Sequence, residues 1–203
     1  MQRPQLKTGG GEFTPYVKYN AKAGRWYTKQ DHENAEEEEV KNLTAVFDLE
    51  NTKTAWMLFE AGAAPQKHYD TVPGVPDQRP EGDRWKHGIE FMMYSGKNLY
   101  GVREFSTTAN SVLEAYLDLW DKWDAAPEKA SGHLPVVQCT GTAPITGKHG
   151  TNYKPEFAIV AWANRADTPL ADSASKEVAS APAPTPAPAP APAPATAQGS
   201  PEF

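Results

Sequence analysis

The feature that most constrains this chain is a run near its C-terminus in which proline alternates mainly with alanine. Seven prolines lie between Pro182 and Pro194 of the 203-residue sequence. Proline fixes φ and has no backbone N–H donor, so such a run forms an extended polyproline-like rod that cannot join a packed core. We therefore predict one folded domain at residues 1–170, followed by a disordered Ala/Pro-rich tail at residues 171–203.

The predicted domain has the composition of a single unit with its own core. It holds all six tryptophans of the chain, together with many Tyr, Phe, Val and Leu residues that favour strands. The only cysteine, Cys139, leaves no disulfide framework and no cysteine-based zinc site, which fits a reducing compartment. Since no run of about 18 apolar residues occurs, we expect a soluble, cytoplasmic protein without membrane contact.

The hydrophobic patterns predict a mainly β domain with one helix. In chain order we expect strands at residues 43–49, 54–60, 88–94 and 98–105, a helix at 108–123, and strands at 134–141 and 155–162. From residue 43 onward this is the element order of an OB-fold-like five-stranded barrel with one helix between strands three and four. An extra N-terminal hairpin, turning at Gly24, precedes the barrel.

Finer expectations concern how these elements are placed. A polar turn at 50–53 predicts that strands 43–49 and 54–60 form a hairpin, and the four prolines of 61–83 predict a long surface loop. The alternation on strand 88–94 assigns its apolar set to the core, and the helix should bury one stripe and begin at a capping side chain. The residues concerned are Ile89, Phe91 and Met93 for the strand, Leu113, Leu117 and Trp120 for the stripe, and Asn110 or Ser111 for the cap.

The charges are distributed unevenly, although the net charge is −6. Residues 1–29 carry six basic side chains and one acid, whereas residues 31–39 carry six acids and no base. We expect the acidic stretch to be a solvated, flexible loop, with a partner-binding or nucleic-acid-mimicking role as the alternative. A basic face would then remain on the N-terminal hairpin.

This hairpin combines aromatic and basic residues in the way that single-stranded nucleic acid requires. Bases stack on aromatic rings while Lys and Arg follow the phosphates. The alternative is a core hairpin with a solvated lysine edge that only prevents edge pairing. The candidate nucleic-acid-binding residues here are Tyr16, Lys18, Tyr19, Lys22, Arg25, Trp26, Tyr27 and Lys29.

Further candidates come from segments that would flank the binding face of an OB-fold. The loop 143–154 contains lysines and a tyrosine that could contact phosphates and bases. The end of the proline-rich loop repeats this combination of aromatic and basic residues. For Arg103, which shares a strand face with Phe105, structural packing is the alternative. These weaker candidates are Trp85, Lys86, Tyr94, Arg103, Lys148, Tyr153 and Lys154.

The sequence offers little that would support catalysis. The five histidines are scattered singly, and no nucleophile elbow, phosphate-binding loop or dinucleotide fingerprint occurs. The pairs His68 with Asp70 and Asp83 with His87 lack a third metal ligand nearby. We expect no catalytic residue, no metal and no cofactor.

Several runs together resemble a group of phage and prophage single-stranded-DNA-binding proteins. They are residues 15–27, 55–65, 103–105 and 153–162. The resemblance implies an OB-fold that coats single-stranded DNA during replication, recombination or repair in the cytoplasm of a bacterial host. The neutral Ala/Pro linker departs from the strongly acidic tail usual in such proteins.

The C-terminal residues Gly199–Phe203 have two interpretations. An acid before a final phenylalanine, here Glu202 and Phe203, resembles the tip that recruits replication or recombination proteins, but a common cloning site encodes the same five residues. Two other functions stay open for the chain, a phage structural or scaffold module that binds protein and a metal-dependent nuclease. The oligomeric state is also open, a homodimer included.

Overall fold

A computed structural model describes residues 14–29, 36–60, 63–148 and 150–171, and these form a mainly β fold. The predicted mainly β class is confirmed. The predicted disordered tail and the tip residues Glu202 and Phe203 lie outside the described residues, apart from Ala171 at the start of the tail. No helix in the described ranges combines the length and apolar character that a membrane span needs.

Ten strands form one mixed sheet. The strands are β1 (Tyr16–Asn20), β2 (Arg25–Lys29), β3 (Glu37–Val40), β4 (Thr44–Phe47), β5 (Lys53–Leu58), β6 (Gln66–Tyr69), β7 (Lys86–Ser95), β8 (Gly101–Thr107), β9 (His133–Gly147) and β10 (Gly150–Asn164). The helices are α1 (Asn110–Asp124), α2 (Pro127–Ala130) and a 3-10 turn at Arg165–Asp167. The sheet order is β10-β9-β4-β7-β8-β1-β2-β3, with β5 beside β7 and β6 beside β5. Among the described strands, only β1 and β8 pair in parallel.

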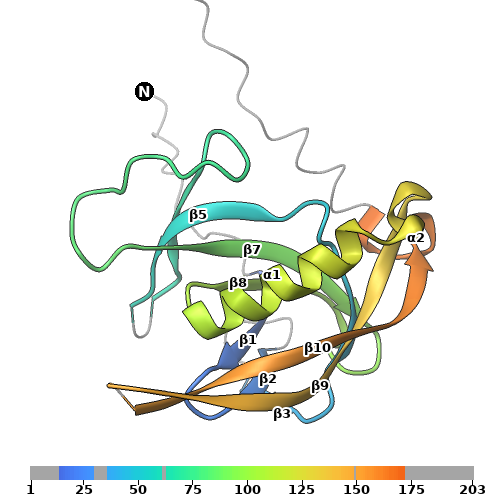
Figure 1. The fold of residues 1–203 in the computed structure, drawn as a ribbon, viewed down its shortest axis with the longest axis horizontal. Coiled ribbons are helices and arrows are strands. Elements are labelled where there is room, and N and C mark those ends of the chain that lie inside the picture. Colours follow the sequence, from blue (N-terminus) through green and yellow to red (C-terminus); the bar gives the residue numbers. More distant parts are fainter. Residues whose placement is uncertain (1–13, 30–35, 61–62, 149, 172–203) are drawn as a thin grey trace, which may run out of the picture.

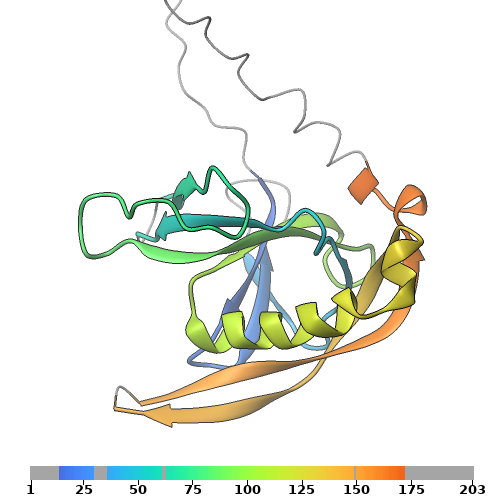
Figure 2. The ribbon, with the colours of Figure 1, turned by 45° about the horizontal axis from the view of Figure 1, so that its top comes forward.

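The sheet is strongly curled, and α1 lies on its concave side between β7 and the long β9–β10 hairpin (Figures 1 and 2). The main core fills this concave side with side chains from the sheet and the helix, among them Trp26, Phe47, Phe91, Phe105 and Leu119. The predicted core set Ile89, Phe91 and Met93 is confirmed, because all three are buried. The far end of the β9–β10 hairpin extends past the N-terminal end of α1 (Figure 2).

The predicted five-stranded barrel is wrong, since the sheet is open and has ten strands. The helix does not lie between strands three and four either, because it follows β8. The main difference lies at residues 50–53, where the Thr52 amide donates to the Leu49 carbonyl at 3.2 Å, so that a turn is present but does not close a hairpin. β4 and β5 do not pair with each other but run along the same edge of β7, at Met93–Tyr94 and at residues 86–90.

The interruption between β4 and β5 is held by an ion pair with the C-terminal segment. Arg165 donates two hydrogen bonds to the buried carboxylate of Asp48, at 2.6 and 3.0 Å. Asn51 donates a third to Asp48, at 2.9 Å. Beyond this anchor, Leu170 is fully buried against Val46 and Leu134. Glu50, a polar residue of the predicted turn, also accepts a hydrogen bond from Arg165, at 2.9 Å.

Three predicted loops contain strands. Glu37–Val40 of the acidic stretch forms β3, and Gln66–Tyr69 of the proline-rich segment forms β6 on the edge of β5. Most of the predicted loop 143–154 belongs to β9 and β10, whose ladder continues to Gly147 and Gly150. In each case a strand far away or across a turn supplies the backbone partners that the local composition did not indicate.

The helix is where the sequence predicted it, but its buried face differs. Leu117, expected in the core, is 59% exposed, whereas Leu119 is 1% exposed. The buried residues are Val112, Ala115, Tyr116, Leu119 and Trp123, with Leu113 and Trp120 packed at the margin. The predicted cap is also wrong, because the cap residue is Ala109 and no side chain bonds the free amides.

The two leucines provide a matched test of this packing. Leu119→Ala should destabilise the protein by about 2–5 kcal/mol, because it removes a buried side chain and leaves a cavity. Leu117→Ala, on the same helix, should change the free energy of unfolding by less than about 0.5 kcal/mol. Chemical denaturation of both variants measures the difference. Equal losses of stability in the two variants would contradict the observed burial of Leu119 and exposure of Leu117.

Candidate nucleic-acid interface

The β1–β2 hairpin is shaped by its turn at residues 21–24. Gly24 has φ of +66°, and its amide donates to the carbonyl of Asn20 at 2.8 Å. A Cβ at this position would lie 3.1 Å from Cγ of Tyr153, so glycine also permits the close approach of β10. The Tyr153 amide donates to the carbonyl of Ala21. The structure thus brings Tyr153 of the predicted 148–154 segment beside the turn that carries Lys22.

Strand alternation divides the predicted residues of this hairpin between two faces. Trp26 is 4% exposed in the core, and the ring of Tyr19 lies 4.8 Å from it with its hydroxyl donating to the Tyr153 carbonyl. The opposite face carries Lys18 directly across from Tyr27 and Asn20 across from Arg25. We call the residues Tyr16, Lys18, Arg25, Tyr27 and Lys29 the outward hairpin face.

The basic residues of the outward hairpin face have acidic partners on β3. Because β3 pairs with β2, Glu37 and Glu39 lie across from Lys29 and Tyr27. Lys18 donates to Glu37 at 2.6 Å, and Arg25 donates to Glu39 at 3.1 Å. The acidic stretch was expected to leave the basic face free. Instead, its described part covers one edge of that face.

These contacts shift two ionisation equilibria. Burial alone would raise the pKa of Glu37, but hydrogen bonds from Lys18 and Tyr16 outweigh it and lower this pKa below its usual value. Burial, with help from Glu37, raises the pKa of Tyr16 to about 12. Tyr16 therefore stays neutral and donates its hydroxyl hydrogen to Glu37, at 2.9 Å.

The weaker candidates do not all join this face. Arg103 is 2% exposed and lies across from the core residue Met93, so its surroundings favour the packing alternative. Lys154 donates to Asp118 of α1 at 2.7 Å. Lys148 is exposed near the tip of the β9–β10 hairpin. Trp85 and Lys86 lie at the start of β7, at the opposite end of this strand from the β7–β8 turn.

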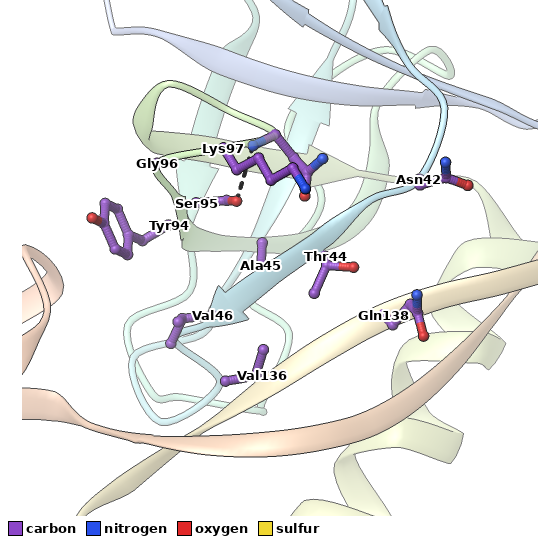
Figure 3. A pocket seen from close by; sticks show the side chains of 11 residues that line it. Asn42, Thr44, Ala45, Val46, Tyr94, Ser95, Gly96, Lys97, Val136 and Gln138 are labelled. Carbon is purple, nitrogen blue, oxygen red and sulfur yellow. Dashed lines mark hydrogen bonds between the residues drawn. The ribbon is translucent and has the colours of Figure 1, made fainter.

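Tyr94 belongs to a second feature that the sequence did not indicate. It lines a groove of about 700 Å³ between β4, β9 and the β7–β8 turn, shown in Figure 3. A smaller groove of about 230 Å³ continues past the same turn, because both are lined by Asn42, Lys97 and Asn98. Lys97 and Tyr100 repeat the aromatic-basic combination of the hairpin, and this signal could have identified the turn.

The titratable groups that suggested metal ligands are paired differently in the structure. Nε2 of His87 lies 2.7 Å from Oδ2 of Asp70, whereas the sequence suggested His68 or Asp83 as partners. Lys67 forms ion pairs with Glu90, at 2.5 Å, and with Glu104. Within the described residues, no group of three or more His, Cys, Asp or Glu side chains is placed to hold a metal ion.

Comparison with known proteins adds no constraint. No protein-family model matches the chain, and neither a curated protein nor a solved structure matches it. The function is therefore inferred from the outward hairpin face and its surroundings.

The lowered pKa of Glu37 provides a test of the ion pair with Lys18. Lys18→Met should raise this pKa toward its usual value, because the main hydrogen-bond donor is lost. Stability from the pair should be present above the usual glutamate pKa and disappear as the pH falls through the lowered value. An NMR titration of the Glu37 carboxyl carbon measures the pKa, with Lys22→Met as the control. An unchanged value in Lys18→Met would contradict the observed pairing.

Proposed function

We propose that this protein binds single-stranded DNA without sequence preference and without catalysis, through the outward hairpin face. One observation carries the proposal. The rings of Tyr16 and Tyr27, both partly buried, share the outward strand surface with Lys18, Arg25 and Lys29, while the opposite surface of the same strands is in the core. The phage-like resemblance of these sequence runs points in the same direction, toward replication, recombination or repair.

The chemistry of this face suits a flexible strand. Each base has a π surface, so stacking on tyrosine tolerates any sequence, while the cations contact the evenly spaced phosphates. The Lys18 ammonium lies 5.8 Å from the centre of the Tyr27 ring, which places a charge beside a stacking surface. Duplex DNA hides its base faces and would gain only the charge contacts.

The acidic strand β3 gives this interface an internal competitor. Glu37 and Glu39 hold the Lys18 and Arg25 side chains in place when no ligand is bound. Phosphates must displace these carboxylates to reach the same cations. Both acids are partly exposed, so each pair is weak and can exchange, at a cost of about 0.2–1 kcal/mol.

The binding assay should use a label on the DNA. Trp26, the tryptophan of the hairpin, is buried, so stacking on the outward face need not change its fluorescence. Recruitment of replication proteins through Glu202 and Phe203 stays a prediction, as does a homodimer.

Removal of one stacking ring tests the interface. Tyr27→Ala should weaken the binding of fluorescently labelled oligo-dT roughly tenfold, since each stacked base contributes about 1–3 kcal/mol. Leu117→Ala, which removes an exposed apolar side chain from α1, serves as the control. Fluorescence anisotropy at low salt measures both. The proposal fails if the unmodified protein does not bind oligo-dT, and the site is misplaced if Tyr27→Ala binds as well as the control.

Removal of the competing acids should have the opposite effect. The double variant Glu37→Gln with Glu39→Gln should bind oligo-dT about three- to tenfold more tightly, because the cations no longer exchange partners. Glu38→Gln on the same strand loses the same charge, but Glu38 lies across from the buried Thr28 and faces the other side. An equal gain per charge from Glu38→Gln would show that only net charge matters.

A further inference from the structure

The groove beside the β7–β8 turn has the dimensions and the lining of a small-ligand site. Its volume of about 700 Å³ is within the range of roughly 300–1,000 Å³ typical of such pockets. Strand β4 passes between β7 and β9 here, and the turn at residues 95–98 rises beside it. Figure 3 shows Tyr94 at one end of the groove, Asn42 and Gln138 at the other, and Lys97 reaching over it.

The chemistry of the lining is specific in two respects. Among the described residues, Lys97 is the only charged side chain in the lining and no acid lines the groove, so the groove favours an anion. The remaining lining combines an aromatic ring and apolar side chains with the amides of Asn42, Asn98 and Gln138. A ligand that fits must therefore carry a negative group, a flat apolar face and polar edges. A nucleotide has all three.

A residue with a strained backbone, Tyr100, follows this turn and lines the smaller groove together with Lys97. Tyr100 has φ of +59°, the only non-glycine residue with positive φ in the described part of the chain. Its side chain is nevertheless 55% exposed, beside the smaller groove that shares Lys97 and Asn98. Backbone strain of this kind is found at ligand-binding sites. Here it presents an aromatic ring to solvent.

We propose that this groove binds one nucleotide unit of a bound single strand. Lys97 contacts the phosphate, Tyr94 and the apolar floor at Val46 and Val136 contact the base or sugar, and the amides of Asn42 and Gln138 contact polar edges. The inference rests on the proposed function, because the strand also occupies the outward hairpin face. A free mononucleotide has the same chemistry, and the experiment distinguishes the two sources.

Photo-cross-linking with an oligo-dT that contains 4-thiothymidine locates the bound bases. Trypsin places the β7–β8 side of the groove in peptides 87–97 and 98–103, its β4 and β9 sides in peptides 42–53 and 130–148, and the hairpin in peptides 8–18 and 26–29. We expect cross-links in both groups. Excess thymidine 5′-monophosphate that removes only the groove cross-links would identify the free nucleotide as a ligand, and groove cross-links that persist would identify the strand.

Two failures can be told apart. Cross-links confined to the hairpin peptides would overturn the groove site and leave the proposed function intact. An absence of any cross-link, with no affinity for oligo-dT, would overturn the proposed function itself.

Substitutions in the groove give an independent measurement with the full chain. Lys97→Ala should weaken oligo-dT binding and reduce the steepness of its salt dependence by about 0.7, the contribution of one phosphate contact on a single strand. Gln138→Leu should weaken binding without changing the salt dependence. Lys122→Ala, an exposed lysine of α1, is the control. Affinities equal to that of the control for both variants would overturn the inference.

Discussion

The burial of Trp26 is the interaction on which the candidate interface depends. Its ring packs 5.3 Å from that of Phe105 and 6.1 Å from that of Phe157, measured between ring centres, and its Nε1 donates to Sγ of Cys139 at 3.4 Å. These contacts join β2 to β8, β9 and β10 and fix which face of the hairpin enters the core. Because side chains alternate along a strand, Arg25 and Tyr27, which flank Trp26 in the sequence, must then face outward. The outward orientation of the candidate interface is thus a consequence of core packing.

Electrostatics alone would not make this surface attractive to DNA. The chain carries a net charge of −6, and β3 places Glu37 and Glu39 against the cations that would contact phosphate. On this surface we expect phosphates to replace the carboxylates as partners of the cations, while the tyrosine rings provide the contact that does not depend on base sequence. We expect such a surface to discriminate against nonspecific anions, since only a ligand that also stacks recovers the cost of displacing the carboxylates.

Local patterns predicted the parts of this fold that depend on local geometry. The alternation of Ile89, Phe91 and Met93 and the turn at Gly24 could be read directly, because strand period and positive φ are properties of a few adjacent residues. The parts that failed depend on distant partners. The pairing of Asp48 with Arg165 joins residues 117 positions apart, and without it the segment after β4 looks like a hairpin turn. The choice between Leu117 and Leu119 is likewise made by the sheet beneath the helix.

The candidate site shows the same division. Sequence composition identified the hairpin at residues 16–29, but it could not indicate that Glu37 pairs with Lys18, because that contact requires β3 to join the sheet. The ionic-strength dependence of the affinity of the full chain for oligo-dT tests the central claim most directly. The logarithm of the association constant should fall linearly with the logarithm of salt concentration, with a slope of about −2 from the three outward cations and about −3 when Lys97 also contacts a phosphate. An affinity that does not change with salt, or no affinity at the lowest salt concentration, would contradict it.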